Sequence, residues 1–370
     1  RARVHSIHVT MNKLFILFPC SPLEGIQRVD EDFKDEMNAA IDAGFKVIFF
    51  DHDLLVREGN VKFNQDVPND DLIILRGWML TLEQYEKLFR ACNGLLINDP
   101  QLYESKHYWP KAYEQYQVLR DNSPRCFWTN TKEFSVNHIK QFFGGKPVIV
   151  KDHVKSAKGA PNAMFIKNSA NKAEVFTVIN NMIAERGKLF QRGIVLKEQV
   201  DLKRDQDGNT IEFRVFFLDG KPISIESNGC SWDYLRAQMM PKSSIKDKVQ
   251  VIGAALGKGF YTVDFMLVDD TWMVLECGDG QVSGLAVGAN ARLFYERLRS
   301  ELMKGKPKEE ELPDDYKVHY DYLYVADGKV VRSDIQGTVR DLRRDLESRG
   351  ISAKEITNCD IFARTNKTIA

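Results

Sequence analysis

The N-terminal third of the chain alternates short apolar runs with amphipathic segments. The run at residues 14–18 is typical of a buried strand, and we expect Pro19 to end it. Apolar residues at helical spacing predict a helix over residues 32–43, which Gly44 would end. Further expected elements are strands at 45–50 and 72–75 and a helix from Thr81 to Leu88 with the capping-box pair Thr81 and Gln84. Such alternation with short loops indicates a mostly parallel sheet covered by helices.

The middle of the chain favours paired strands instead. One short strand ends on Lys151, and another, over residues 193–198, also ends in charge. Tight turns at Asp219-Gly220 and Asp269-Asp270 predict two hairpins, over residues 211–226 and 260–279. Helices are expected at 172–186, 246–256 and 291–303, and the apolar stripe on the first of these indicates core packing without a cofactor.

Five charged side chains interrupt these apolar strands, in the order Lys151, Lys197, Arg214, Asp264 and Glu276. Buried charge is expensive unless it is paired, so such positions usually face a counter-charge or a metal ion. Lysine offers a point charge and arginine a planar fork to phosphate oxygens, and Mg²⁺ takes one or two carboxylates besides water and phosphate. The order of the five favours a site for a nucleoside triphosphate and its metal. Taken singly, each basic residue is more often a strand-end solvent contact, and the two carboxylates would equally suit a solvated hairpin.

These landmarks resemble the ATP-grasp superfamily. The shared pattern is a lysine-bearing strand, a Lys-Glu-x-Val strand, a Glu-x-Arg-Val-Phe hairpin, and Val-Asp-Phe and Leu-Glu strands, in that order. The N-terminal half looks like the divergent bacterial and phage branch named for an arginine and two lysines. That likeness is carried by the run from Leu75 to Leu80, which contains Arg-Gly-Trp, by Glu83-x-Tyr85, and by Tyr103 with His107. The resemblance covers residues 12–305.

The resemblance implies a role for each matching residue. Lys151 and Lys197 would contact the ATP phosphates or the N7 side of adenine, with Lys151 and Arg214 as the catalytic cations. Arg214 would meet the γ-phosphate or an acyl-phosphate intermediate. The remaining implied contacts are backbone groups of Glu198 and Val200 to adenine, Asp201 to the ribose, and Asp264 and Glu276 to Mg²⁺.

Two departures from the family pattern concern the metal strand and the phosphate loop. The family has Glu-x-Asn where this chain has Glu276-Cys277-Gly278, so we expect Asp279 to replace the missing asparagine ligand. The loop after Lys151 holds one glycine where the family has several, so Lys155 or Lys158 would cover the phosphates instead.

The expected fold class is α/β (α+β): an ATP-grasp fold of two lobes, preceded by a parallel-sheet α/β domain and followed by a small αβ appendix. The predicted segments are a leader or tag at 1–10, the pre-ATP-grasp domain at 11–125, lobe 1 at 126–190, lobe 2 at 191–310 and the appendix at 315–370. A charged run with two prolines at 304–313 would be the linker. The helix over 337–349 is basic on its outer side (Arg340, Arg343, Arg344, Arg349), which fits a solvated face or a docking surface for an anionic macromolecule.

The function that the resemblance implies is an ATP- and Mg²⁺-dependent carboxylate–amine ligase. Such an enzyme phosphorylates a carboxylate to an acyl phosphate, which an amine attacks to give an amide, with release of ADP and phosphate. Loops at 227–234 and 278–285 would form acceptor pockets for a small-molecule, peptide or macromolecular substrate, with Trp232 stacking a ring and Arg76 binding an anion. Packing of Trp232 and a structural salt bridge of Arg76 are the alternatives. A phosphotransferase on the same fold and a catalytically idle nucleotide-binding module remain alternative functions.

Composition agrees with this interpretation without demanding it. Lysine plus arginine equals aspartate plus glutamate at 52 each, so no net charge points to general nucleic-acid or membrane binding. No apolar run approaches the length of a membrane span. The six cysteines lack any C-x-x-C pair, which favours a reduced, cytoplasmic protein, and Cys277 is expected to be a structural thiol. The oligomeric state is not indicated.

Overall fold

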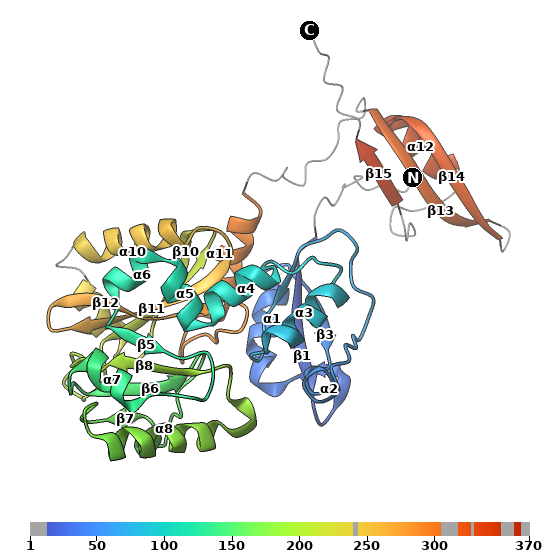
Figure 1. The fold of residues 1–370 in the computed structure, drawn as a ribbon. Coiled ribbons are helices and arrows are strands. Elements are labelled where there is room, and N and C mark those ends of the chain that lie inside the picture. The colour runs from blue at the N-terminus through green and yellow to red at the C-terminus, as the bar shows by residue number, and fades with distance from the viewer. Residues whose placement is uncertain (1–12, 240–242, 305–316, 327–328, 349–358, 364–370) are drawn as a thin grey trace, which may run out of the picture. The chain divides into compact units, whose positions relative to one another are not determined.

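A computed structural model of the chain describes residues 13–239, 243–304, 317–326, 329–348 and 359–363 (Figure 1). The chain divides into two compact units, residues 14–302 on the one hand and residues 1–13 with 303–370 on the other. The predicted leader at 1–10 and residues 305–313 of the predicted linker lie outside the described residues. Among the described helices, none combines the length and the apolar character that crossing a membrane requires.

The first sheet of the larger unit is mostly parallel, as predicted. Its centre is β1, which pairs in parallel with β3 and β4 and antiparallel with β2. The helices α1, α2 and α3 belong to the same part of the chain, and the predicted capping box of Thr81 and Gln84 is present at the start of α3. The bounds are β1 (Phe15–Ser21), β2 (Gly25–Val29), α1 (Lys34–Asp42), β3 (Lys46–Phe50), α2 (His52–Glu58), β4 (Ile73–Leu75) and α3 (Leu82–Ala91).

Strand β1 does not end at Pro19, which corrects the expectation from sequence. Pro19 stands opposite Phe50 in the parallel ladder, and β1 continues to Ser21. The carbonyl oxygen of Pro19 accepts a hydrogen bond from the backbone N–H of Asp30. Proline is tolerated here because its acceptor is used and no strand needs its missing N–H.

The second sheet is antiparallel, in the order β5-β8-β6-β7. Helix α8 lies on the side of this sheet away from β11 and β12 (Figure 1), where its apolar stripe packs with Val148, Val150 and Leu196. Strand β8, which the predicted boundaries place in lobe 2, therefore pairs within the lobe 1 sheet. The bounds are β5 (Cys126–Trp128), α7 (Val136–Phe143), β6 (Val148–Asp152), β7 (Phe165–Ile166), α8 (Lys172–Arg186) and β8 (Ile194–Glu198).

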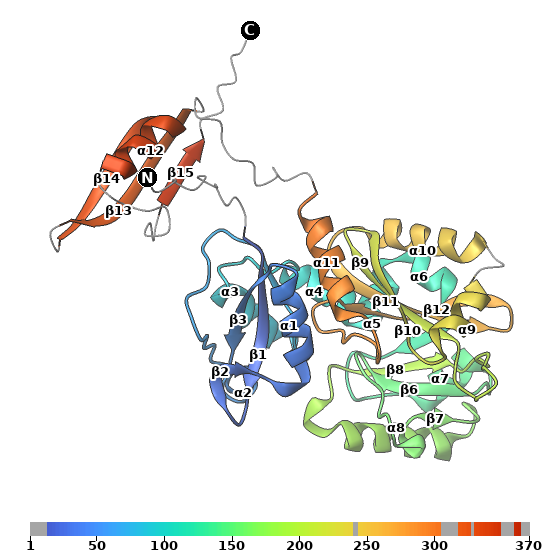
Figure 2. The same cartoon turned by 180° about the vertical axis from the view of Figure 1, so that it is seen from behind.

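The third sheet is also antiparallel, in the order β10-β9-β11-β12, and both predicted hairpins are present in it. One face of this sheet is apolar and forms a core with Trp109, Ala112 and Leu119, which the predicted boundaries place in the N-terminal domain. Figure 2, which views the structure from behind, shows α10 and α11 beside this sheet. The bounds are α4 (Pro100–His107), α5 (Trp109–Gln115), α6 (Gln117–Asn122), β9 (Glu212–Leu218), β10 (Lys221–Ser227), α9 (Trp232–Met239), α10 (Ser243–Leu256), β11 (Phe260–Val268), β12 (Thr271–Asp279) and α11 (Ala291–Leu302).

The smaller unit contains a three-stranded antiparallel sheet in the order β14-β13-β15. Helix α12 (Val339–Ser348) follows directly on β14, and its side chains Arg340 and Arg344 are exposed. The side chain of Arg343 and the whole of Arg349 lie outside the described part of the chain. The strand bounds are β13 (Lys317–Ala326), β14 (Lys329–Thr338) and β15 (Cys359–Ala363).

A buried ion pair joins the first sheet to the segment after β12. Arg76, at the end of β4, is 1% exposed, and its guanidinium pairs with Glu36 of α1 at 2.9 Å. The same guanidinium donates to the carbonyl oxygens of Gly280 and Ser283, and Tyr295 donates its hydroxyl to Glu36 at 2.7 Å. The structural salt bridge that the sequence left open is therefore formed, and Arg76 holds the residues that follow β12.

We predict that Arg76→Met destabilises the protein by about 3–5 kcal/mol, because the substitution leaves the Glu36 carboxylate buried without its cation. The free energy of unfolding from urea titration measures this. Arg292→Gln is the matched control, since Arg292 pairs with Glu296 on an exposed helix face and its loss should leave the transition unchanged. Equal stability of Arg76→Met and wild type would show that the pair does not anchor this segment.

Candidate functional site

Four charged side chains form a continuous row across the third sheet. The strand register places Glu226 of β10 opposite Arg214 of β9, Arg214 opposite Asp264 of β11, and Asp264 opposite Glu276 of β12. Residues that stand opposite each other in a ladder share a face of the sheet. The row therefore lies on one face, while the alternate residues of the same strands build the apolar core on the other.

Arg214 and Asp264 form the centre of this row. The guanidinium donates from Nε to Oδ1 at 2.7 Å and from Nη2 to Oδ2 at 2.8 Å, which is the bidentate geometry that arginine and carboxylate favour. The third donor, Nη1, reaches the carbonyl oxygen of Gly284 at 2.9 Å. Burial by itself lowers the pKa of the Arg214 guanidinium, but its bond to Asp264 outweighs burial and raises that pKa above the usual value.

The two predicted lysines meet β12 from the second sheet. Lys151 on β6 and Lys197 on β8 share a face of their sheet, because Lys151 stands opposite Val195, two residues from Lys197. The Lys151 ammonium binds the Glu276 carboxylate, and Lys197 donates to the carbonyl oxygen of Leu275 at 2.5 Å. Burial would raise the pKa of Glu276, yet the charges of Lys151, Lys155 and Lys197 outweigh it and lower the pKa to about 2. Glu276 is therefore a permanent carboxylate.

Lys197 is the most strongly perturbed cation of the site. It is 7% exposed, and its Nζ lies 3.4 Å from the centroid of the Trp109 ring. Burial and the neighbouring charge of Lys151 lower its pKa to about 7. Additional negative charge, such as a phosphate group, would stabilise the protonated ammonium here.

A small cleft of about 30 Å³ opens where the row meets the second sheet. His107 of α4 lines it, and the Nε2 atom of this buried imidazole has no partner among the described residues. Burial, and then the charge of Lys155, lower its pKa to about 3, so the ring is neutral at physiological pH. The polar side chains that line the cleft are His107, Lys155, Arg214, Thr262, Asp264, Glu276 and Ser283.

Asp264 and Glu276 fit a magnesium ion, since two carboxylates on adjacent strands leave room for water and phosphate oxygens. Asp279 does not join them, which corrects the sequence expectation. Asp279 is three residues from Glu276 and points to the opposite face, where it is fully buried and accepts a hydrogen bond from Asn98 at 2.6 Å. The structure groups no three His, Cys, Asp or Glu side chains as metal ligands among the residues it describes.

Hydroxyl groups occupy the position of the missing asparagine side chain. A Cβ atom at Gly278 would lie 3.0 Å from both Thr262 Oγ1 and Ser283 Oγ. These two hydroxyls are 2.9 Å apart and line the cleft with the two carboxylates. Oxygen donors are thus present beside the carboxylates, supplied by two neighbouring residues in place of one amide.

The basic loop after β6 is fixed at its start. Asp152 is fully buried, its Oδ1 accepts from the backbone N–H groups of Val154 and Lys155 at 2.7 Å, and Arg186 donates to its Oδ2 at 2.9 Å. Lys155 and Lys158 are both exposed, and Lys155 lines the cleft. The loop therefore presents one cation to the row, with Lys158 further along in solvent.

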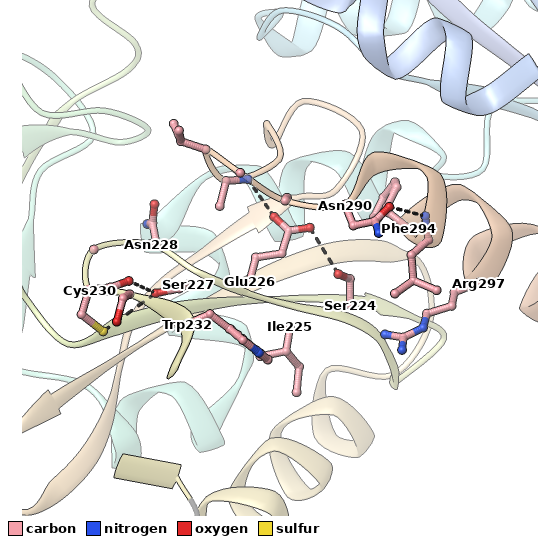
Figure 3. Close-up of a pocket in the computed structure, with 17 residues that line it drawn as sticks. Ser224, Ile225, Glu226, Ser227, Asn228, Cys230, Trp232, Asn290, Phe294 and Arg297 are labelled. Atoms are coloured by element: carbon pink, nitrogen blue, oxygen red, sulfur yellow. Dashed lines mark hydrogen bonds between the residues drawn. The ribbon is translucent and has the colours of Figure 1, made fainter. Parts of the chain in front are cut away.

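The predicted adenine and ribose contacts lie together at the end of β8. Glu198 pairs with Lys146 at 2.5 Å, Val200 is half-buried, and Asp201 is exposed. Their roles stay predictions. Trp232 lies elsewhere, in a separate pocket of about 750 Å³ beside β10 (Figure 3).

Two residues of the site were not singled out from the sequence. The sequence pattern indicates Glu226 only as the last residue of a predicted hairpin, although its carboxylate completes the row and the residue is 6% exposed. His107 enters the sequence interpretation only through the family resemblance. A glutamate at an inner strand position is a usable signal for the first, whereas a lone histidine on a helix gives none.

The architecture defines the class of protein, an ATP-grasp fold. A solved structure with this fold, the RimK domain protein ATP-grasp from Sphaerobacter thermophilus DSM 20745, matches with a TM-score of 0.50 and 12% identity, over 78% of this chain and 98% of that chain. D-alanyl-alanine synthetase A from Vibrio cholerae O1 biovar eltor str. N16961 matches with a TM-score of 0.48 and 10% identity, over 80% of this chain and all of that one. At 12% identity, the likeness to the Sphaerobacter structure shows the fold alone. No curated protein matches the sequence.

The particular family follows from residues 142–298, which match a family model of the ATP-grasp domain. That model describes family 3 of the clade named for an arginine and two lysines. Residues 142–298 are therefore an ATP-grasp domain of this clade, and the predicted superfamily and branch are confirmed for this segment. The matched segment contains Lys151, Lys197, Arg214, Asp264 and Glu276.

We predict that one lysine of the protein titrates near pH 7 and that Lys197→Met removes this titration. The folded-state pKa lies below the ordinary value of 10.5, so the native state holds fewer protons than the unfolded state between about pH 7 and 10. Unfolding stability contributed by this group therefore rises with pH in that window. Lysine labelled with ¹³C at Cε allows the titration to be followed by NMR, and a Cε signal that stays constant from pH 6 to 9 for every lysine would contradict it.

Proposed function

We propose that this protein is an ATP- and Mg²⁺-dependent carboxylate–amine ligase that acts through an acyl phosphate. The observation that carries the proposal is the charged row with its two lysines, in which Arg214, Lys151 and Lys197 face Asp264 and Glu276. A phosphoryl transfer site needs cations and a metal around the transferring group and little other chemistry. The membership in the ATP-grasp family supports the same assignment.

Each residue then has a physical task. Asp264 and Glu276 would hold Mg²⁺, which would neutralise charge on the phosphate oxygens. Arg214 keeps a fixed direction because Asp264 and the Gly284 carbonyl bind three of its donors, so its fork is oriented before a phosphate arrives. Lys151 and Lys197 supply positive charge from the opposite sheet, and the pKa of Lys197 rises as phosphate enters.

In the structure, groups of the protein itself bind these cations. Lys151 binds Glu276, and Lys197 binds the Leu275 carbonyl. We infer that Lys151 would exchange the Glu276 carboxylate for a phosphate oxygen of the nucleotide, which would leave Glu276 available to hold Mg²⁺. The exchange conserves the count of charge pairs, which keeps its cost low.

We predict that Mg²⁺-ATP raises the melting temperature of the wild type and that Glu276→Gln and Lys151→Met each abolish the rise. Saturation at about a hundred times the dissociation constant adds about 2.7 kcal/mol, which corresponds to several degrees for a chain of this size. ATP with EDTA should give a smaller shift than ATP with Mg²⁺. Arg292→Gln, which changes only an exposed ion pair on α11, should retain the full shift.

A second experiment separates the ligase from the alternatives. With Mg²⁺-ATP, a panel of carboxylic acids and hydroxylamine, we expect a hydroxamate and ADP in equal amounts, because hydroxylamine captures an acyl phosphate. Arg214→Met should lower hydroxamate formation by about 10²-fold or more, as loss of a transition-state charge contact does. ADP formation with a stable phosphate ester and no hydroxamate would select a phosphotransferase, and nucleotide binding without ADP formation would select an idle module.

A further inference from the structure

A second pocket, of about 750 Å³, lies beside β10 (Figure 3). The segment 282–290 lines both this pocket and the cleft. One end of this segment, with Val282 and Ser283, lines the cleft, and the other, from Ala286 to Asn290, lines the pocket. Two members of the row hold the middle of this segment: Arg214 binds the carbonyl oxygen of Gly284, and Glu226 accepts from the N–H of Ala286 at 2.7 Å.

We propose that this pocket binds the amine substrate as an apolar amino acid or the amino-terminal residue of a peptide, with its ammonium group on Glu226. The proposal rests on the ligase function proposed above and names the class of its second substrate. It assigns Glu226 as the residue that binds the amine and takes its proton.

The carboxylate of Glu226 is the charged group at the inner wall of the pocket. It is 6% exposed and has two fixed hydrogen bonds, from the Ala286 N–H to Oε2 and from the Ser224 hydroxyl to Oε1 at 3.2 Å. A carboxylate has about four acceptor sites, so two remain for an ammonium group. Burial raises the pKa of this carboxyl above its ordinary value, which also suits a group that receives a proton.

The rest of the lining favours a ligand with an apolar side chain. Among the described residues, twelve large apolar side chains are exposed, and four of them, Ile225, Trp232, Val287 and Leu293, line this one pocket. Exposed apolar side chains gathered in a pocket mark binding surfaces. Figure 3 shows Glu226 and Ser224 on one side of the β10 ribbon and Trp232 and Ile225 on the other, so the pocket extends around the strand edge.

Arg297 supplies the opposite charge. It lies on α11 at the pocket wall, is exposed, and forms no ion pair with the residues that the structure describes. A ligand carboxylate is the natural partner for a guanidinium of this kind. Glu226 and Arg297 together fit a zwitterion, either a free amino acid or a short peptide.

The place of Glu226 in the row explains how the amine would reach the acyl group. Glu226 stands opposite Arg214, the residue proposed to hold the acyl phosphate. The ammonium gives one proton to Glu226, and the freed nitrogen lone pair forms the C–N bond to the acyl carbon. The bond from that carbon to the phosphate oxygen breaks, phosphate leaves with the electron pair, and it takes the second proton from nitrogen. Glu226 returns its proton to solvent, so atoms and charge balance.

The test is direct binding by calorimetry, without ATP, of L-leucine, L-leucyl-L-leucine, its N-acetyl derivative and its C-terminal amide. We expect binding of the free-amine dipeptide, a loss of about tenfold or more on N-acetylation, and a similar loss in Glu226→Gln. Arg297→Gln should weaken the dipeptide and leave the amide unchanged. If leucine alone binds as tightly as the dipeptide, the natural ligand is a free amino acid; if the dipeptide is tighter, it is a peptide terminus.

Arg292→Gln, on the same helix but outside the pocket lining, is the control and should bind like the wild type. Equal binding of the acetylated and free dipeptides, or no binding of any of the four ligands, overturns the proposal. The acetylation comparison uses wild-type protein, so it decides even if Glu226→Gln fails to fold. A retained Mg²⁺-ATP shift with no binding of any of the four ligands refutes this pocket alone, whereas ligand binding with no Mg²⁺-ATP shift refutes the proposed ligase function.

Discussion

The bidentate pair of Arg214 and Asp264 is the interaction on which the rest of the site depends. It lies at the middle of a sheet whose other face is a closed apolar core, so neither partner can move without leaving the other buried and unpaired. Its neighbours extend the pair in both directions, to Glu226 on one side and to Glu276 on the other. Charges thus alternate from Glu226 to Asp264, and Lys151 and Lys197 compensate the two adjacent carboxylates. Each charge of the row has a partner within the protein. In the proposed function, Lys151 exchanges its partner for a phosphate oxygen.

The segment after β12 connects this row to the first sheet. Arg76 binds the carbonyl oxygens of Gly280 and Ser283, Arg214 binds that of Gly284, and Glu226 binds the N–H of Ala286. Three side chains from three separate elements therefore hold one short segment at successive points. Because this segment lines both the cleft and the pocket beside β10, its position sets the distance between the two proposed substrates. Arg76 acts through the segment and does not contact either cavity.

Sequence alone predicted the part of the site that depends on local strand patterns. Lys151, Lys197, Arg214, Asp264 and Glu276 each interrupt an apolar strand, and the structure brings all five to the row and its two lysines. Glu226 escaped because of a β-bulge: the register of β9 and β10 shifts between Pro222 and Ser224. Without the shift, the two-residue turn would place Ile225 opposite Arg214. A bulge inserts a residue without a composition signal of its own, so the shift could not be counted from the sequence. The prediction for Asp279 was wrong because residues an odd number apart on one strand face opposite sides, and Asp279 is three residues from Glu276 on β12. The burial of Arg76 depends on contacts between segments more than two hundred residues apart, which no local pattern contains.

The absent asparagine of the metal strand shows how a site can keep its chemistry while changing the residue that supplies it. Gly278 leaves a space that the hydroxyls of Thr262 and Ser283 fill, each 3.0 Å from where a Cβ would stand. A larger side chain at position 278 would have to displace both hydroxyls, and the Ser283 hydroxyl is itself fixed by a 2.7 Å bond to the Asp279 carbonyl. Glycine with the two hydroxyls is therefore one way to place oxygen atoms beside the carboxylates, and asparagine is another. A hard metal ion distinguishes little between an amide oxygen and a hydroxyl or bound water, so the loss of asparagine is no argument for an inactive site.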